Sequence, residues 1–343
     1  MRFKPFSTLP AVLMAAALLL AGGVTTSTPA AAADEIVIKA DQPSSNAQSW
    51  SIALAKVRDL VAERTGGKVK IQIYPDGVLT NRNLRTVIQM LQSGAIQMGM
   101  FLPAFYEQFD PRWQIFSFPF LFSDQQAAYG LCDGEMGQFL LDTLREKNIQ
   151  GLALWEHGFR QFTTRDKPMR VPGDMKGMKM RVMSAPTFIT MVEGLGANPT
   201  ATSMGELFTA LQQGVVDGQE NPISSIYLNR FFEVQNYMTV TNHVWNPWVI
   251  GMNAKFFDGL SPDVQKILLD TAKEVTAFER DLVKKADEDM LAKMTTMQKK
   301  IQVISLTAEE QKAWKAATAG VHEKFADKIG KDLLQRFYKA AGY

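Results

Sequence analysis

The stretch SPDVQKILLDTAKEVTAFERDLVKKADEDMLAKMTTM, residues 261–297, is the longest periodic segment of the sequence. Its apolar side chains recur every three or four positions, which is the spacing of one face of an α-helix. Ser261 is a suitable N-cap, and Pro262 suits the first helical position. The pattern predicts a helix over about 263–299, whose length of ~55 Å at ~1.5 Å per residue exceeds the width of one small domain.

Two structures could contain so long a helix. It could be one strand of a coiled coil, but no heptad seam of Leu or Ile is sustained along it. We therefore favour a helix that lies across two lobes of one protein. The length of 343 residues also indicates about two domains, at roughly 100–200 residues per domain. Beyond this helix, Thr307 and Glu310 have the spacing of a capping box and predict a final helix.

Ahead of the long helix, the first part of the chain alternates strand-like and helix-like patterns. Short strands are predicted at 36–40, 69–73 and 95–101, and helices at 50–61 and 84–91. This β-α-β-α-β order is typical of parallel strands joined by helical crossovers. Such sheets usually bind ligands beyond the carboxyl ends of their strands.

The alternation begins again after roughly 120 residues. Strands are predicted at 152–155 and 178–183, helices at 187–195 and 204–213, and Val215 with its neighbour begins a further buried strand. A repeated block of this kind predicts a second α/β lobe. The fold class is therefore expected to be α/β with two lobes.

Residues 1–33 have the features of a secretory signal peptide. Arg2 and Lys4 give a positive start, residues 9–24 are apolar, and small residues lead to a cleavage site after Ala33. A membrane anchor is the alternative, but glycines at 22–23 interrupt an apolar stretch that falls short of the ~20 residues of a spanning helix. We therefore predict export to the periplasm. Removing the signal leaves 35 basic residues against 35 acidic ones, a balance that disfavours nucleic acid as a partner.

Several kinds of catalytic site are missing from the sequence. It has no phosphate-binding loop, no Gly-x-Ser-x-Gly elbow and no dinucleotide fingerprint. Its only cysteine, Cys132, is expected to be a small buried residue, and His157 and His243 to make structural hydrogen bonds. Carboxylate pairs such as Asp217 and Glu220 are common at turns. We expect no enzyme activity, no cofactor and no metal site.

Three cationic or amide side chains form the more informative pattern. Arg160 and Arg181 lie at or near the ends of predicted strands, and Asn221 follows another one. A guanidinium fork matches a carboxylate bidentately, and an amide can bind a remaining oxygen. Each charge-assisted hydrogen bond contributes about 1.5–3 kcal/mol, and micromolar binding requires about 8 kcal/mol. Each Arg taken alone is more commonly a solvated residue at a strand edge.

The sequence resembles a known family, the solute-binding proteins of tripartite ATP-independent periplasmic (TRAP) transporters, of the DctP type. The resemblance extends from about Glu35 to the C-terminus, and its motifs occur in the family's order and spacing. The matching stretches are RTGGKVK (64–70), LQSGAI (91–96), FPFLF (118–122), MKGMKMRV (175–182), GANPT (196–200) and ALQQGVVDGQENP (210–222).

The resemblance implies a type II-like, two-lobed periplasmic binding protein with a hinge and a long helix that crosses both lobes. We expect lobe I to comprise residues 34–157 plus 247–285, and lobe II to comprise 158–246 plus 286–343. The helix over about 263–299 would be shared between them.

By the family pattern, Arg181 would hold a ligand carboxylate, Asn221 would bond to it, and Arg160 would lie at the other side of the pocket. Three further residues would shape the cleft: Met204, Trp245 and Trp248. For the two tryptophans, packing in the core is the alternative. Leu102 stands where sialic-acid binders of this family have an acidic residue, which disfavours that ligand, and Arg82 would add positive charge or lie in solvent.

The implied function is capture of an organic acid and its delivery to the small and large membrane subunits of a TRAP permease, by a monomer whose lobes close about Glu156–His157 and Asn246–Trp248. A C4-dicarboxylate or a sugar acid such as a hexuronate is expected first, with a bulkier, aromatic or keto acid as the alternative. A ligand-sensing protein, the binding protein of an ATP-driven transporter and a periplasmic enzyme remain as other classes.

Overall fold

The computed structural model of the protein describes residues 35–297 and 301–343, and Glu35–Tyr343 forms one compact unit. The predicted signal peptide, residues 1–33, and the last predicted residues of the long helix, 298–299, lie outside the described residues. Within the described ranges, no helix combines the length and the apolar character that crossing a membrane requires.

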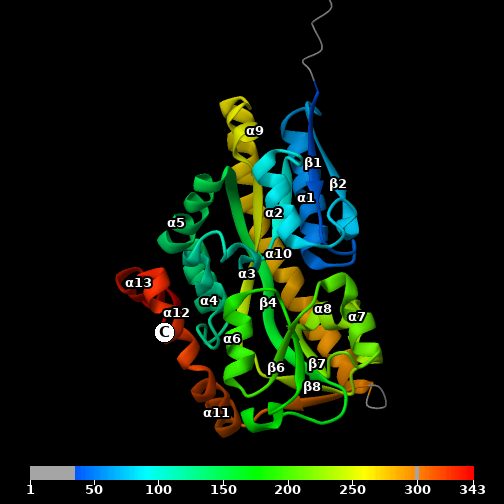
Figure 1. Cartoon of the computed structure of the whole chain (residues 1–343). Helices are drawn as coiled ribbons and strands as arrows, with labels where there is room; N and C mark the ends of the chain where they lie inside the picture. The colour runs from blue at the N-terminus through cyan, green and yellow to red at the C-terminus, as the bar shows by residue number, and fades with distance from the viewer. Residues whose placement is uncertain (1–34, 298–300) are drawn as a thin grey trace, which may run out of the picture. The chain divides into compact units, whose positions relative to one another are not determined.

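The first part of the chain forms the β-α-β-α-β unit that the sequence predicts (Figure 1). Strand β1 (Ile36–Asp41) pairs in parallel with both β2 (Val69–Tyr74) and β3 (Met98–Phe101). The crossovers are α1 (Ser49–Arg64) and α2 (Leu84–Ser93). This prediction is confirmed, except that β3 begins three residues later than expected.

Local capping interactions fix both ends of α2. The Asn83 side chain accepts a hydrogen bond from the backbone N–H of Arg85, with 3.0 Å between Oδ1 and N. At the other end, Gly94 adopts a left-handed conformation with φ of 81°, which glycine tolerates without a Cβ clash. The predicted end of this helix at Gly94 is confirmed, and its start is held at the carboxyl ends of the parallel strands.

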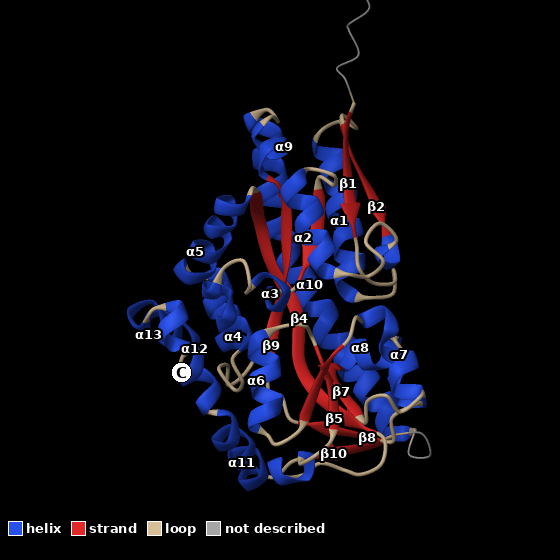
Figure 2. Cartoon of the chain, viewed as in Figure 1, coloured by secondary structure: helices blue, strands red, loops and turns tan. Residues whose placement is uncertain are grey.

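Two long antiparallel strands connect the first and second parts of the fold (Figure 2). Strand β4 (Ile149–Thr164) has 16 residues, which corresponds to about 53 Å at ~3.3 Å per residue. It pairs with β9 (Trp245–Asn253) as far as Phe159, and from Arg160 onward with β7 (Gly218–Pro222). Strand β9 in turn pairs with β3. The sequence predicted only the short segment 152–155 of β4, so the strand is much longer than expected.

The second part of the fold repeats the α/β alternation. Strand β5 (Lys179–Val182) pairs in parallel with β6 (Asn198–Ala201) and with β7, and the predicted helices form α6 (Pro186–Gly194) and α7 (Met204–Gln212). The expectation that Val215 begins a buried strand is wrong. Its side chain is 52% exposed and the strand starts only at Gly218.

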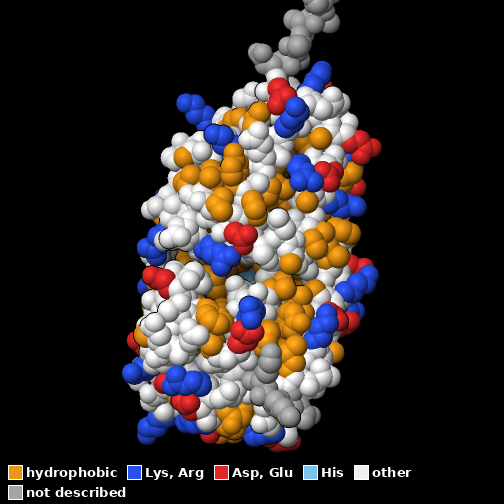
Figure 3. All heavy atoms as spheres, turned by 90° about the vertical axis from the view of Figure 1, so that its right-hand side faces the viewer, with side chains coloured by type: hydrophobic (Ala, Val, Ile, Leu, Met, Phe, Trp, Pro, Cys, Tyr) orange, Lys and Arg blue, Asp and Glu red, His pale blue; other side chains and the backbone are white. Residues whose placement is uncertain are grey.

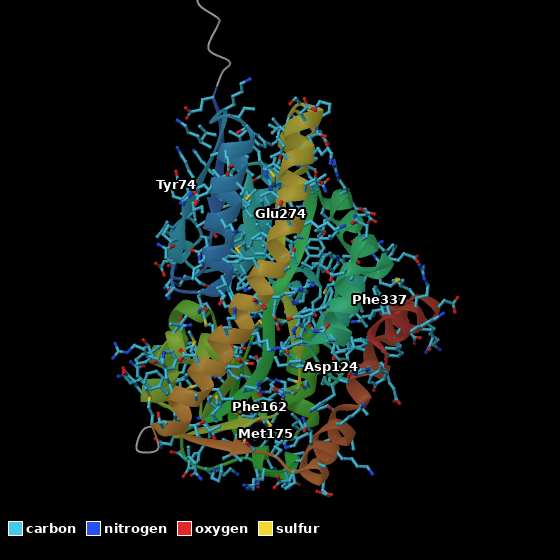
Figure 4. The ribbon with its side chains drawn as sticks, turned by 180° about the vertical axis from the view of Figure 1, so that it is seen from behind. Tyr74, Asp124, Phe162, Met175, Glu274 and Phe337 are labelled. Carbon is cyan, nitrogen blue, oxygen red and sulfur yellow. The ribbon has the colours of Figure 1, made fainter. Side chains whose placement is uncertain are left out.

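The predicted long helix is α10 (Pro262–Thr296), with 35 residues. Seen from behind, the helix runs beside the first part of the fold, where its residue Glu274 is labelled, and continues beside the second part (Figure 4). Glu274 forms an ion pair with Arg64 of α1 at 2.6 Å, and Asp287 accepts a hydrogen bond from the backbone N–H of Ser224 in α8 at 3.0 Å. The helix therefore contacts both parts of the fold, as the sequence predicts.

The remaining elements cover the two parts of the fold. The predicted capping box is confirmed, because Thr307 and Glu310 exchange side-chain and backbone hydrogen bonds at the start of α11. Helix α13 packs on α4 and α5, whereas α11 and α12 contact α6. The exact lobe boundaries stay a prediction. These other elements are η1 (Pro75–Gly77), α3 (Pro103–Tyr106), η2 (Pro111–Ser117), α4 (Gln125–Asp133), α5 (Glu135–Thr143), η3 (Leu144–Lys147), η4 (Pro172–Met175), α8 (Ile223–Leu228), η5 (Phe231–Glu233), β8 (Tyr237–Val240), α9 (Ala254–Asp258), β10 (Gln302–Ser305), α11 (Ala308–Thr318), α12 (Gly320–Ile329) and α13 (Lys331–Ala341).

The half-buried carboxyl group of Asp287 makes the unfolding free energy depend on pH. Burial, and secondarily the charge of Glu156, raises its pKa to about 7. A raised pKa in the folded state stabilises the fold at low pH, and this contribution is lost as pH rises from about 4 through about 7. Asparagine can still accept the Ser224 hydrogen bond and never ionises. Wild type should therefore lose unfolding free energy between pH 5 and pH 8, whereas Asp287→Asn lacks this loss. The difference between variant and wild type is expected to shift in favour of Asp287→Asn by on the order of 2 kcal/mol over this range.

Urea unfolding at the two pH values measures this difference. Asp281→Asn is the matched control, because Asp281 lies on the same helix with an exposed side chain paired to Lys285 at 3.2 Å. Because Asp287 is still present in this control, its unfolding free energy is expected to change with pH as that of wild type does. Equal pH dependence in Asp287→Asn and wild type would contradict the assignment.

Candidate functional site

A cavity of about 380 Å³ lies between the two parts of the fold. Figure 3 shows a hollow at mid-height on the face that carries α1, α2 and α7. The first part of the fold contributes, among others, Gln48, Trp50, Arg82, Arg85 and Phe105. The second part contributes, among others, Arg181, Met183, Thr202, Met204 and Asn221. Among the described residues that line the cavity there is no Asp, Glu or Lys, so its charged groups are cationic.

Strand β5 places Arg181 in the cavity wall, where the residue is 2% exposed. Its Nε atom donates to the carbonyl oxygen of Thr202 at 2.9 Å, and no described carboxylate lies within 4.0 Å of its guanidinium group. Burial lowers the pKa of Arg181 to about 10, with the Arg160 charge adding to this effect against the opposing charge of Glu220. The group is still charged at neutral pH, and its two terminal nitrogens are available to an anion.

Strand β7 brings Asn221 into the same cavity wall. Its Oδ1 atom accepts a hydrogen bond from Nη2 of Arg160 at 3.0 Å, and its Nδ2 atom donates to Oε1 of Gln219 at 2.5 Å. These two bonds fix the orientation of the amide. They use one of the two hydrogens on Nδ2 and leave the other for a ligand.

Arg160 does not line the cavity. It is fully buried in β4, where its Nη2 atom donates to the side chain and the backbone carbonyl of Glu220 at 3.0 and 2.7 Å, and its Nε atom pairs with the same carboxylate. Burial alone would raise the pKa of Glu220, but Arg160 and His243 outweigh burial and hold this pKa below its usual value. The sequence placed Arg160 at the other side of the pocket. The structure places it beside Asn221, where it acts as a positioning residue.

The two tryptophans that were expected to shape the cleft have different surroundings. Trp248 and Met204 line the cavity, and the Trp248 ring lies 5.3 Å from that of Trp50. Trp245 lies in the core, where its Nε1 atom donates to Glu156 at 3.2 Å. Of the two interpretations left open, core packing describes Trp245 and a place at the cavity describes Trp248.

His157 links the two central strands to α8. Its Nδ1 atom lies 3.1 Å from Oδ1 of Asn246, and its Nε2 atom lies 3.3 Å from Oγ of Ser225. Burial, reinforced by the Arg160 charge, lowers the pKa of His157 to about 3. The ring is therefore neutral and makes structural hydrogen bonds, as the sequence suggested.

The cavity also contains residues that the sequence analysis missed. Arg85 is one of them, and Arg82, for which the sequence allowed either the pocket or the solvent, lines the cavity as well. One signal was present in the sequence: both residues follow a predicted strand and lie at the start of a helix, where parallel α/β folds bind ligands. Trp50 was identified only as a core position of a helix.

The residues that the structure describes contain no group of three or more His, Cys, Asp or Glu that could hold a metal ion. Cys132 is buried, and burial raises the pKa of its thiol above the ordinary value, which keeps it protonated.

Comparisons with known proteins agree with this arrangement. The 2,3-diketo-L-gulonate-binding periplasmic protein YiaO of Escherichia coli is 33% identical over 295 residues, covering 85% of this chain and 88% of that protein. The C4-dicarboxylate-binding periplasmic protein DctP of Rhodobacter capsulatus is 33% identical over 309 residues, covering 88% and 90%. The crystal structure of the sugar acid binding protein DctPAm from Advenella mimigardefordensis, in complex with galactonate, superimposes with a TM-score of 0.86 at 32% identity and covers 90% of this chain and 98% of that one.

A family model covers most of the chain as well. The model for bacterial extracellular solute-binding proteins of family 7, DctP, matches residues 41–328. The two α/β parts, the connecting strands β4 and β9 and the crossing helix α10 agree with a two-lobed binding protein. The family and its structural neighbours are solute-binding proteins. The chain belongs to the DctP family of bacterial extracellular solute-binding proteins.

Proposed function

We propose that this protein captures an organic acid through its carboxylate and delivers it to the membrane subunits of a TRAP transporter. The observation that carries the proposal is the buried guanidinium of Arg181, which lines the cavity without a carboxylate partner among the described residues. A buried charge is costly unless it is paired. A ligand carboxylate would supply the missing partner, and the free N–H of Asn221 would bind one of its oxygens.

The hydrogen bonds of Arg181 and Asn221 are strong enough to supply much of the binding free energy. Two or three charge-assisted hydrogen bonds contribute about 1.5–3 kcal/mol each, against about 8 kcal/mol for micromolar affinity. Trp50, Trp248 and Met204 supply apolar surface for the carbon skeleton. Carboxylate recognition and apolar contact together are therefore adequate for a transport protein.

Closure of the lobes is the second part of the proposal. The predicted hinge segments Glu156–His157 and Asn246–Trp248 lie opposite each other in the β4–β9 pair. The pairing shifts register between Glu156 and Gly158, and Gly158 has φ of 106°. An irregularity in a two-strand connection is a suitable place for bending. Ligand contacts from both parts of the fold would shift the protein toward the closed form that a permease recognises.

The ligand class rests on the relatives and on the cavity. Relatives are named for C4-dicarboxylates and for 2,3-diketo-L-gulonate, and one solved structure holds galactonate. A C4-dicarboxylate or a sugar acid is the first expectation, and a bulkier keto or aromatic acid is the alternative that the aromatic lining leaves room for. The predicted export and cleavage after Ala33 fit this role, and the mass of the mature protein tests that site.

A thermal-shift screen of the mature protein against small carboxylates is expected to raise the melting temperature for a narrow set of acids. A ligand at 100 times its dissociation constant stabilises the folded state by about 2.7 kcal/mol. The matching neutral amides are expected to give no shift, because they lack the charge that Arg181 requires. Equal shifts with acids and amides would refute carboxylate recognition, and turnover of an acid would indicate an enzyme instead.

A further inference from the structure

Glu107 has a buried carboxyl group that the proposed ligand contacts do not use. It follows α3 in the first part of the fold and is 2% exposed, and among the described residues no cation lies within 4.0 Å of its oxygens. Its hydrogen bonds reach the second part of the fold instead. Oε2 accepts from the hydroxyl group of Thr187 at 2.6 Å, and Oε1 accepts from the backbone N–H of Thr187 at 3.2 Å. A carboxyl group is unfavourable to bury unless it is hydrogen-bonded, so Glu107 depends on Thr187 for its place in the interior.

Thr187 lies in the first turn of α6, and this helix has no cap of its own. Ala185 at the N-cap has no side chain that could accept a hydrogen bond, and Pro186 at the first helical position has no N–H. Thr187 therefore supplies the first backbone N–H of the helix, and Glu107 accepts it. The partial positive charge at the N-terminal end of a helix favours an oxygen acceptor there. The first part of the fold thus caps a helix of the second part, and Figure 2 shows α3 above α6.

A second contact joins the same two segments beside the cavity. Gln108 donates from Nε2 to the carbonyl oxygen of Ser184 at 3.1 Å, and Ser184 lines the cavity. Ser184 lies three residues after Arg181 in the connection from β5 to α6. This connection begins beside the proposed ligand anchor and ends at the helix that Glu107 caps. It is therefore attached to the first part of the fold at two points.

We propose that Glu107 is a positioning residue for ligand binding, which caps α6 from the first part of the fold and thereby holds Arg181 and the adjoining cavity wall in place. This inference rests on the proposed function, because Arg181 is the anchor that it concerns. Closure of the two parts brings the cap to its helix, and their separation removes it. The ligand therefore binds more tightly when the cap is made, and the two events stabilise each other.

The protonation of Glu107 provides a readout that a purely structural role would not affect. Burial raises its pKa from the usual 4.5 to about 7, against the opposing effects of Thr187 on α6, Ser117 on η2 and the charge of Lys328 on α12. The protonated group keeps Oε1 as an acceptor for the Thr187 N–H. Because the pKa is raised where the carboxyl group is buried, closure is favoured at low pH, and this contribution is lost as pH rises through about 7. Ligand affinity of wild type should therefore fall about tenfold between pH 6 and pH 8.

Isothermal titration calorimetry at the two pH values tests the proposal with succinate, galactonate and galacturonate, which represent the acid classes of the proposed function. Glu107→Gln keeps an oxygen acceptor but cannot ionise. Its affinity for the tightest of these acids should stay within about threefold of wild type at pH 6 and should lose most of the wild-type pH dependence. Glu107→Leu removes both acceptors and should bind about tenfold or more weakly at pH 6. Glu63→Leu, an exposed position of α1 outside the cavity lining, is the control and should bind like wild type.

A variant in α6 tests the contact from the second part of the fold. Thr187→Val removes the hydroxyl donor and should weaken binding. Combined with Glu107→Leu, it should weaken binding no further than Glu107→Leu alone, because both changes remove one shared interaction. Additive losses would overturn the proposal, as would wild-type affinity in Glu107→Leu at an unchanged melting temperature. Equal pH dependence in wild type and Glu107→Gln would overturn it as well.

Arg181→Ala separates this inference from the proposed function. Loss of all binding in Arg181→Ala together with wild-type affinity in Glu107→Leu would refute only the role of Glu107. No binding of any of the three acids to wild type would contradict the proposed function, and with it this inference.

Discussion

Replacing Arg181 by alanine is expected to abolish measurable binding of the native acid. The substitution removes the two terminal nitrogens that are proposed to bind the ligand, and among the described residues that line the cavity it removes the only buried charge. Two charge-assisted hydrogen bonds at about 1.5–3 kcal/mol each correspond to a loss of roughly 10²–10⁴-fold in affinity. Isothermal titration calorimetry with the acid identified by thermal shift measures this loss.

Two companion variants make the Arg181 result specific. Arg165→Ala is expected to bind like wild type, because Arg165 lies outside the cavity lining and pairs with Asp166 at 3.0 Å. Arg181→Lys is expected to lose most of the affinity, since a point charge cannot reproduce the planar fork. Wild-type affinity in Arg181→Ala would refute the assignment of Arg181 as the carboxylate anchor.

Arg160→Ala is expected to destabilise the protein by about 3–5 kcal/mol, because it leaves the Glu220 carboxylate buried without its main partner. His243, with Nε2 at 3.5 Å from Glu220, would be the remaining group near that charge. Asn221 would also lose the donor that orients its amide. Urea unfolding should therefore show a lower midpoint, and calorimetry should show weaker binding in whatever folded protein remains.

A double variant distinguishes the effect of leaving Glu220 without its ion-pair partner from the effect of losing the packing of the Arg160 side chain. Arg160→Met combined with Glu220→Gln removes both charges, so it is expected to be more stable than Arg160→Ala. Its ligand affinity should remain low, because Asn221 is still without its hydrogen-bond donor. A loss of less than about 1 kcal/mol in Arg160→Ala would mean that the buried pair has little influence on folding.

Much of the framework could be predicted from local sequence patterns. The long helix was visible because its cap at Ser261 and its apolar spacing are both local signals, and α10 begins one residue from the predicted start. The extent of β4 was not visible. Glu156, His157 and Arg160 are polar residues inside it, and they are paired in the interior with residues 60 or more positions away along the chain. A pattern of neighbouring residues carries no information about such partners.

The lack of information about distant partners also limited what the sequence could predict about the cavity. Arg181 and Asn221 were identified through motifs, and the structure places both in one cavity wall. The position of Arg160 depends on the pairing between β4 and β7, and the sequence alone does not predict which strands pair. The sequence therefore predicted Arg160 in the pocket, whereas the structure has it behind Asn221. Arg85 was missed because a basic residue near a helix start usually lies in solvent. The three-dimensional arrangement places it at the cavity, with no carboxylate partner in the part of the chain that the structure describes.

A crystal structure of the mature protein with the acid that gives the largest thermal shift is the decisive test of carboxylate capture by Arg181. We expect a ligand carboxylate within hydrogen-bond distance of the terminal nitrogens of Arg181, with one of its oxygens bound by Nδ2 of Asn221. The rest of the ligand should lie against Trp50 and Trp248. An acid bound outside this cavity, or bound with its carboxylate away from Arg181, would refute the role proposed for Arg181.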